Sequence, residues 1–246
     1  MTFTNEEYGA FRTFVETSYD NFKGRGLRYD TDDNLEAYSA ALSNAGHYIS
    51  VPHDPCSNHL TPENSYWGKL LDPAGEVVAG HAQQLIQTRS MWHEIQSGRL
   101  YADRKPGVVL LDQGFYEDLN FPDFGGRIVF GGSAWIHPDW RNRNHSESLY
   151  QDFMALSRAI SIRHWDADYY VALFKDTPNR RHLGLEGADF ENAITISNGP
   201  SPANEGRVLP LILMWSSRDY IIKRIYRTNF LAESAVDDGI LRYRIA

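Results

Sequence analysis

The chain has 246 residues and is 42% hydrophobic, 23% charged and 13% aromatic. This length can bury one full core without requiring a second, and the composition argues against intrinsic disorder. The net charge is −8, so the chain lacks the basic surplus typical of nucleic-acid-binding proteins. We therefore expect a single domain over residues 1–246 and no nucleic-acid partner, and the acidity mildly favours cationic substrates such as amines.

Compartment signals point to the cytoplasm. The single cysteine, Cys56, rules out an intrachain disulfide, which fits a reducing compartment. Residues 1–10 carry Glu6 and Glu7 and no basic-then-apolar sequence, so they do not match a signal peptide. No apolar run approaches the roughly 20 residues needed to span a bilayer. We expect a cytoplasmic protein with no membrane partner.

Two helices are predicted at the N-terminus. Thr4 and Glu7 form a capping-box pattern that predicts the start of the first helix. Its predicted apolar stripe consists of Tyr8, Phe11, Val15, Tyr19 and Phe22. A second helix is expected to begin at residues 31–33 and to end at Gly46. Its buried stripe would be Leu35, Tyr38 and Leu42.

A loop and a hairpin follow. Residues 53–62 are rich in Pro, Asn, Ser and His and predict a loop. His53, Cys56 and His59 could hold zinc, but their spacing matches no usual site, so a plain polar loop is the favoured interpretation. Residues 66–71 and 76–86 predict two strands joined by a turn at Asp72-Pro73-Ala74-Gly75.

The middle of the chain mixes short elements. Residues 88–98 predict a short helix whose inward side chains are Met91, Trp92 and Ile95. Residues 107–111 could form a strand, and residues 118–126 are rich in turn formers. Residues 127–137 predict a strand interrupted by Gly131-Gly132, a pattern that marks a bulge or the close approach of a ligand or another backbone.

The second half of the chain alternates helices and strands. The longest predicted helix covers residues 146–164, with Leu149, Phe153, Leu156 and Ile160 on one face. The remaining predicted elements are strands at 169–174, 190–196 and 209–215, a short helix at 178–187 and a helix within the tail. This order predicts an α/β fold with a mixed sheet and helices on its faces.

The segment from Ser133 to Leu149 carries the functional information. It predicts a strand, a tight polar turn and a long helix. Arg141 and Arg143 lie in the turn, where backbone N–H groups of the helix start have no helical partner. Such a site attracts phosphate through these donors and the helix dipole, and arginines add charge and paired donors.

This segment resembles the acyl-CoA motif of the GNAT (GCN5-related N-acetyltransferase) family, V-x-P-x-x-R/Q-x-x-G-x-G/A followed by a leucine. Ile136 stands at its first position, Pro138 at the proline and Arg141 at the Arg/Gln, while Asn144 and Ser146 take the two glycine positions and Leu149 the leucine. The likeness covers residues 133–190 in motif and about 5–215 in the order of elements. It implies a mostly antiparallel mixed sheet with a splayed strand pair at the cofactor site.

The resemblance also implies where an acyl-CoA would bind. The backbone amides of Ala134, Trp135 and Ile136 would pair with the pantetheine arm and polarise the thioester carbonyl. The pyrophosphate would lie over the turn formed by Arg141, Asn142, Arg143, Asn144, His145 and Ser146. Asn179, at the start of the later short helix, would also contact the cofactor. Arg180-Arg181-His182 could reach the 3′-phosphate, although a solvent-exposed position is favoured.

The chain departs from the family pattern at several positions. Asn142, Asn144 and Ser146 stand where the motif has small residues, mostly glycine, although Asn tolerates left-handed dihedrals well. The family's usual acid is a tyrosine in the last short helix, and no tyrosine occurs between Asn179 and Phe190. This absence leaves the catalytic acid to be assigned.

Candidate catalytic residues are therefore sought on neighbouring strands. His81 and His137 could accept a proton from the amine, and the alternative for each is a structural histidine with satisfied hydrogen bonds. Tyr169 or Tyr170 could donate a proton to the leaving thiolate, and the alternative is core packing. No metal site is expected.

The leading hypothesis is an N-acyltransferase that moves an acetyl or other acyl group from acyl-CoA to a primary amine of a small molecule or peptide. Residues 1–60 and 87–126 would shape the acceptor site, and residues 216–246 would form a C-terminal extension. One alternative is a catalytically silent acyl-CoA-binding or scaffold protein. Another is a related enzyme with a different donor, such as an acyl carrier protein, since the acidic charge disfavours aminoacyl-tRNA. A homodimer is left open.

Overall fold

The computed structural model describes residues 3–97, 99–100, 123–141, 146–175, 190–199 and 209–237. The strands of this part of the chain are β1 Arg28–Asp32, β2 Ser65–Leu71, β3 Val77–Thr88, β4 Gly126–Ile136, β5 Tyr169–Lys175, β6 Asn192–Gly199 and β7 Leu209–Ser217. The helices are α1 Asn5–Gly24, α2 Leu35–Asn44, the 3-10 turn η1 Val51–His53, α3 Met91–Gln96, α4 Pro138–Arg141, α5 Ser146–His164 and α7 Arg218–Asp237.

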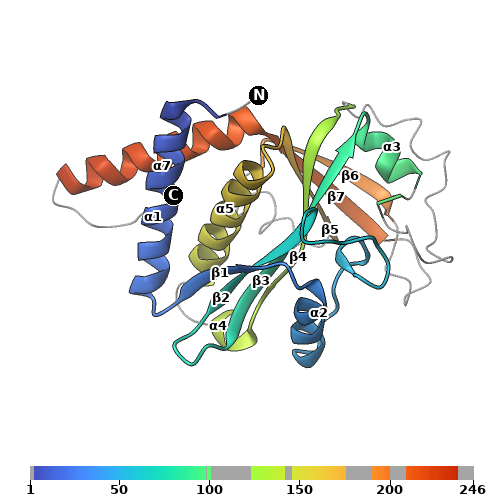
Figure 1. The fold of residues 1–246 in the computed structure, drawn as a ribbon, viewed down its shortest axis with the longest axis horizontal. Coiled ribbons are helices and arrows are strands. Elements are labelled where there is room, and N and C mark those ends of the chain that lie inside the picture. The colour runs from blue at the N-terminus through green and yellow to red at the C-terminus, as the bar shows by residue number, and fades with distance from the viewer. Residues whose placement is uncertain are drawn as a thin grey trace.

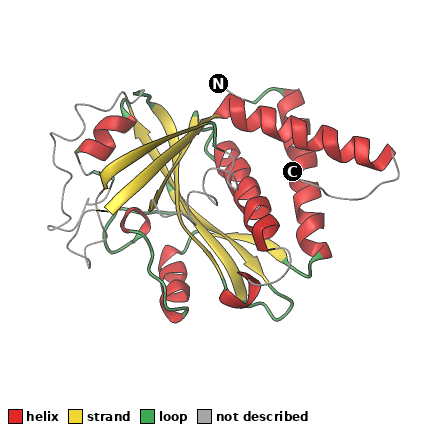
Figure 2. Ribbon diagram, turned by 180° about the vertical axis from the view of Figure 1, so that it is seen from behind, coloured by secondary structure: helices red, strands yellow, loops and turns green. Residues whose placement is uncertain are grey.

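These strands form a single sheet in the order β1-β2-β3-β4-β5-β7-β6 (Figure 1). Neighbouring strands are antiparallel except for β4 and β5, which are parallel. Helices flank the sheet on both faces (Figure 2). The predicted fold class, a mixed and mostly antiparallel sheet flanked by helices, is confirmed.

The two faces of the sheet carry separate apolar layers. On one face, α5 packs on β3, β4 and β5, and α1 and α7 pack against each other and against α5 (Figures 1 and 2). Phe153 and Leu156 of α5 join Val129 and Tyr170 of the sheet in this layer. On the other face, α2, η1 and α3 cover the sheet. Alternate strand residues point to opposite faces, so each strand contributes to both layers.

Helix α1 begins at the predicted capping box. The Thr4 backbone N–H donates to Glu7 Oε2 at 2.7 Å, and the Glu7 backbone N–H donates to Thr4 Oγ1 at 3.2 Å. The predicted stripe is wrong in part. Phe11, Phe14, Ser18 and Phe22 are the buried positions, whereas Tyr8 and Tyr19 are 50% and 44% exposed. The buried face of α1 is centred closer to Phe14 because the helix packs against α5, α7 and β1 at once. The spacing of apolar residues along the sequence does not show how these partners are arranged around the helix.

The predicted start of the second helix was wrong by about three residues. Residues 28–32 instead form the edge strand β1, which pairs with β2 from Arg28↔Leu71 to Asp32↔Trp67. The helix starts only after Asn34, whose side chain accepts from the Ala37 backbone N–H at 2.9 Å. The predicted stripe of α2 is buried, and Gly46 follows the helix with φ 72° as expected for a helix end.

The other expected elements divide into those the structure describes and those it does not. The hairpin of β2 and β3, the helix α5, the strands β5, β6 and β7, and the tail helix α7 are all present, with ends shifted by no more than a few residues. Helix α3 buries Met91 and Ile95, while Trp92 is half-buried. The expected strand at 107–111 and the short helix at 178–187 lie outside the described residues. None of the helices in the described ranges is both long and apolar enough to cross a bilayer.

Candidate active site

Strands β4 and β5 run side by side only over part of their length. They pair in parallel up to Gly131 and Ala172. Beyond these residues the recorded pairing of β4 is with β3 alone, and that of β5 is with β7 alone. The two strands therefore part, and we call the space between residues 132–136 and residues 173–175 the β4–β5 opening. It corresponds to the splayed strand pair that the resemblance to the GNAT family implied.

Side-chain burial changes at the point where the strands part. Ala172 is buried, and the next two residues of β5, Leu173 and Phe174, are half-buried. On β4, Ser133 is half-buried and Ala134 is exposed. Ser133 and Ala134 of β4 are thus small and reachable, so a ligand could approach their backbone closely.

A β-bulge lies on the β4 side of this opening. Gly80 of β3 pairs with Trp135, and Ala82 pairs with Gly132, so two residues of β4, Ser133 and Ala134, oppose the single residue His81. Ser133 has φ 53°, in the left-handed region that side chains other than glycine rarely adopt. The predicted irregularity is confirmed, but the bulged residues follow Gly131-Gly132 instead of being those glycines.

The start of α5 lies at the same end of the sheet as the opening. After β4 the chain passes through α4 and enters α5, which runs back so that β5 can follow in parallel. A helix that connects two parallel strands begins near their carboxyl ends, which is where β4 and β5 part. Its first backbone N–H groups and the positive end of its dipole suit a phosphate.

Several expected cofactor-binding residues fall in this connection. Arg141 ends α4 and Ser146 begins α5. Asn142, Arg143, Asn144 and His145 lie outside the described residues, as does Asn179. Their roles toward a cofactor remain predictions.

A hydrogen-bonded chain meets the bulge on the face covered by η1. Ser133 Oγ accepts from the Ser50 backbone N–H at 2.7 Å and lies 2.7 Å from Ser50 Oγ. Ser50 Oγ lies 3.0 Å from Nδ1 of His53, and Nε2 of His53 lies 3.0 Å from the carbonyl oxygen of Phe130. We call Ser133, Ser50 and His53 the serine–histidine chain. The Tyr38 hydroxyl donates to the Ser133 carbonyl oxygen and anchors the bulge from α2.

A second polar group lies beneath β4 on the α5 face. His81 of β3 and Tyr170 of β5 meet under Gly131, with 3.3 Å between His81 Nε2 and the Tyr170 hydroxyl. Gln83 Nε2 donates to His81 Nδ1 at 2.8 Å and to Ser157 Oγ at 3.0 Å. Because Nδ1 accepts, the proton of neutral His81 resides on Nε2 and points to Tyr170. These four side chains lie together in the layer under α5.

Burial sets the protonation of both histidines. Desolvation lowers the pKa of His53 to about 4, although its bond to the Phe130 carbonyl works in the opposite direction. Burial, assisted by the nearby His53 and Arg158, lowers the pKa of His81 to about 3. Burial also raises the pKa of Tyr170 above its ordinary value. At neutral pH both imidazoles are neutral and the phenol keeps its proton.

In fold, the chain resembles the GNAT acyltransferases. The mostly antiparallel sheet, the parted strands β4 and β5, and the bulge at the opening are the features that the sequence resemblance implied.

Comparison with solved structures finds acetyltransferases. The chain is similar to NAA60 of Arabidopsis thaliana in complex with acetyl-CoA, with a TM-score of 0.44 and 10% identity over 78% of this chain and 99% of that chain. It is similar to the ribosomal-protein-S5-alanine acetyltransferase of Vibrio fischeri, with a TM-score of 0.46 and 10% identity over 79% and 95%. It is also similar to an N-acetyltransferase of Staphylococcus aureus, with a TM-score of 0.44 and 7% identity over 78% of this chain and 97% of that chain.

At such TM-scores and identities, no ligand or activity follows for this chain from these likenesses. No protein-family model matches the sequence. No curated protein matches it either.

The remaining expected site residues near the opening differ in burial and in the face of the sheet to which they point. Trp135 is buried with the α2 layer and Ile136 with the α5 layer, so their side chains belong to the core. His137 follows β4 with its side chain 41% exposed, and its Nδ1 lies 3.7 Å from Asp139 Oδ2. Tyr169 points to the face opposite Tyr170, where its ring lies 4.5 Å from that of Phe124. The structure does not bring His137 and Tyr169 together, and their catalytic roles remain predictions.

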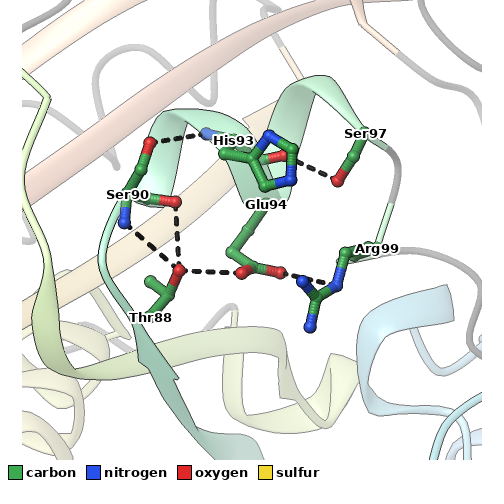
Figure 3. A network of polar contacts seen from close by, with 6 residues as sticks. All are labelled: Thr88, Ser90, His93, Glu94, Ser97 and Arg99. Carbon is green, nitrogen blue, oxygen red and sulfur yellow. Dashed lines mark hydrogen bonds and ion pairs between the residues drawn. The ribbon is translucent and has the colours of Figure 1, made fainter.

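A separate polar network fixes α3 at the far end of β3 (Figure 3). Glu94 is 7% exposed, accepts from Thr88 Oγ1 at 2.8 Å and lies 3.4 Å from Arg99 Nε. Ser90 caps the helix by accepting from the His93 backbone N–H at 3.0 Å. A cavity of about 200 Å³ borders this network, lined by residues 84–87 of β3 with Glu94, Arg99 and Leu100. The partners of Glu94 satisfy a carboxylate that burial would otherwise penalise, so the network holds α3 in place.

Sequence reasoning missed the serine–histidine chain. The sequence pattern indicates His53 only as a possible zinc ligand or as part of a polar loop, but the structure buries it completely and engages both ring nitrogens. Among the described residues, no group of three or more His, Cys, Asp or Glu side chains is arranged to hold a metal ion. The signal that was present is Ser133 directly after two strand glycines. Its partners lie more than 80 positions away along the chain, beyond the reach of local patterns.

Proposed function

We propose that this chain is an N-acyltransferase that transfers an acetyl or other acyl group from an acyl-CoA to a primary amine. The observation that supports it is the β4–β5 opening, in which two parallel strands part next to a bulge and beside the start of α5. An extended thioester arm needs a strand-like row of backbone donors, and its pyrophosphate needs N–H groups at a helix start. The opening combines both requirements at one end of the sheet.

The residues at the opening fit an acyl-CoA. Ala134, Trp135 and Ile136 would offer backbone groups to the pantetheine arm, and the small Ala134 side chain leaves that backbone reachable. Arg141 and the start of α5 at Ser146 would hold the pyrophosphate. A backbone N–H at the bulge would polarise the thioester carbonyl as negative charge develops on its oxygen. The amine would attack the carbonyl carbon directly, and CoA would leave as the thiol.

The test is calorimetric binding of acetyl-CoA to the full chain, combined with thiol release in the presence of a panel of primary amines. Binding with amine-dependent thiol release supports the proposal. Binding without turnover over a broad panel would favour the silent acyl-CoA-binding alternative. Absence of binding would overturn the proposal.

One substitution localises the binding site. Arg141→Ala removes a charged donor from the expected pyrophosphate site, and acetyl-CoA affinity should fall about tenfold or more, as expected for loss of a charge-assisted hydrogen bond. Arg12→Ala is the matched control, because it deletes the same charge from the exposed surface of α1, where Arg12 is 3.8 Å from Glu16. Equal effects of the two substitutions would show that the site lies elsewhere.

A further inference from the structure

We infer that Ser133 takes a proton from the attacking amine and passes it through Ser50 toward His53, and that the same chain returns it to the leaving thiolate. This inference rests on the proposed function and adds the residues that would move the proton. Ser133 would touch the substrate, whereas Ser50 and His53 act through it. The inference starts from the position of Ser133, half-buried on the bulge at the edge of the β4–β5 opening.

The hydrogen bonds of the serine–histidine chain have a fixed direction. The Phe130 carbonyl can only accept, so the imidazole nitrogen 3.0 Å from it, Nε2 of His53, carries the proton. In neutral His53, Nδ1 is therefore an acceptor, and the Ser50 hydroxyl 3.0 Å away donates to it. Ser50 Oγ in turn accepts from the Ser133 hydroxyl at 2.7 Å. Each hydroxyl thus already points its proton toward His53.

Ser133 has one acceptor position to offer a substrate. A hydroxyl oxygen has two lone pairs, and the Ser50 backbone N–H, 2.7 Å away, occupies one of them. The second lone pair can accept an N–H of an amine that has entered the opening. The serine–histidine chain therefore begins at Ser133 Oγ, an acceptor that faces the ligand, and ends at His53 Nδ1, an acceptor in the interior.

The backbone at Ser133 is held in an uncommon conformation by contacts on several sides. Its φ of 53° costs free energy for a residue with a Cβ. Tyr38 holds its carbonyl oxygen and Ser50 holds its hydroxyl. Residues kept in such conformations by surrounding contacts are concentrated at functional sites. Here the conformation keeps the hydroxyl of the bulge aligned with Ser50.

The surroundings of His53 suit a transient proton acceptor. Its ring is fully buried and stacks on Phe130 with 5.4 Å between ring centroids. His53 in turn lowers the pKa of His81 across the sheet, and both imidazoles are neutral at neutral pH. An imidazolium formed here would be stabilised by the Phe130 carbonyl and destabilised by burial. It would therefore give its proton up readily to a more basic thiolate.

The proton balance of the reaction closes without another reactant. As the amine nitrogen forms a bond to the carbonyl carbon, its N–H proton passes to Ser133 Oγ. The Ser133 proton passes to Ser50 Oγ, and the Ser50 proton passes to His53 Nδ1. When the C–S bond breaks, these transfers reverse and the proton ends on sulfur. The products are the amide and the free thiol of CoA.

The two histidines named from the sequence are less suited to this role. His81 directs Nε2–H to Tyr170 and accepts from Gln83, so both of its nitrogens are engaged on the α5 face. His137 lies after the end of β4, and its imidazole ring has Asp139 and the ring of Trp135 as recorded partners. In the described part of the chain, no recorded side-chain contact of either histidine involves Ser133.

The experiment compares three variants of the full chain in acetyl-CoA binding and in amine-dependent thiol release. Ser133→Gly removes the hydroxyl and suits the positive φ, Ser50→Ala removes the middle hydroxyl, and His53→Gln keeps a donor for Phe130 but cannot be protonated. Each should lower kcat by about 100-fold or more, the size usual for loss of a proton-transfer group, and leave acetyl-CoA affinity within about twofold of the wild-type value.

Two further variants separate proton transfer from structure. Ser50→Thr restores a hydroxyl and should recover most of the activity lost in Ser50→Ala. Ser65→Ala deletes a buried hydroxyl that donates to the Thr61 carbonyl at 2.9 Å, away from the serine–histidine chain, and should behave as the wild-type chain.

The outcomes distinguish the two proposals. If the wild-type chain binds acetyl-CoA and releases thiol, but Ser133→Gly and His53→Gln keep kcat within about threefold, the proton chain is wrong and the acyltransferase proposal stands. A lower acetyl-CoA affinity of the variants with unchanged kcat would also overturn the proposed proton transfer, because it indicates that these residues have a structural role only. If the wild-type chain does not bind acetyl-CoA, both proposals fail.

Discussion

Gly131 of β4 lies directly over the phenolic oxygen of Tyr170 of β5, and a Cβ at residue 131 would overlap that oxygen. The neighbouring Gly132 faces the other side of the sheet, where a Cβ would come within 2.7 Å of Cε1 of His53. Each glycine therefore makes room for a side chain of the protein itself. The two glycines thus allow the rings of Tyr170 and His53 to pack against β4 from opposite faces, where β4 and β5 part.

Gly131→Ala should lower the free energy of unfolding by about 1–3 kcal/mol, the usual cost of overpacking a filled interior. Tyr170 would have to move, and its contact with His81 would be lost. Urea titration would measure the change. Gly9→Ala in α1 is the matched control, because a Cβ there meets nothing within 4 Å, and it should stabilise the chain by about 0.5–1 kcal/mol. Equal stability of Gly131→Ala and the wild-type chain would contradict the packing of Tyr170 under β4.

Local patterns predicted most elements of this fold because they report local physics. The capping box of α1, the apolar face of α5 and the turn at Asp72 each depend on residues a few positions apart. The sequence did not predict strand β1, because its five residues are held by pairing with β2, about 35 positions away or more. Two of the five residues are aspartates, which are depleted in strands. An edge strand is defined by its partner more than by its own sequence.

For the candidate site, the sequence predicted the backbone arrangement but not the side-chain contacts. The bulge was expected from a strand with two glycines, and the parted strands were implied by the resemblance of residues 133–190 to the GNAT motif. The serine–histidine chain could not be expected, because Ser133 and Ser50 are 83 positions apart and meet only through the packing of η1 on β3 and β4. Sequence spacing gives no access to such long-range side-chain contacts.

The capping box predicts a measurable loss when it is broken. Thr4→Ala removes the side chain that accepts from the Glu7 backbone N–H, and should lower the free energy of unfolding by about 1 kcal/mol. Thr13→Ala makes the same substitution at an exposed position within α1. It should be neutral or slightly stabilising, since alanine has the higher helix propensity. Thermal or urea unfolding distinguishes the two, and equal effects would show that α1 does not depend on its cap.

The bulge predicts that two small substitutions at one position differ in stability. Ser133→Gly loses the hydrogen bonds to Ser50 but relieves the positive φ, so its free energy of unfolding should stay within about 1 kcal/mol of the wild-type value. Ser133→Ala loses the same bonds and keeps the unfavourable φ, so it should be less stable than Ser133→Gly by about 1 kcal/mol. If alanine were as stable as glycine at this position, the left-handed conformation of residue 133 would be refuted.

The buried His53 predicts that stability falls with acidity. Its pKa is lowered from 6.5 to about 4 in the folded chain, chiefly by desolvation. Between these values the unfolded chain binds a proton that the folded chain does not, so the stabilising contribution is complete above pH 6.5 and is lost as pH falls toward 4. For this one residue, the loss between pH 7 and pH 5 should be about 2 kcal/mol.

His53→Gln isolates that contribution, because glutamine does not titrate. His81, whose pKa is lowered to about 3, would act in both the wild-type chain and the variant and would largely cancel in their difference. Urea titrations of both proteins at pH 7, 6 and 5 should show the stability advantage of the wild-type chain shrinking by about 2 kcal/mol. A difference that stays constant over this range would mean that His53 is accessible to protons in the folded chain. In that case the folded chain would not lower the pKa of His53, contrary to the complete burial of its ring.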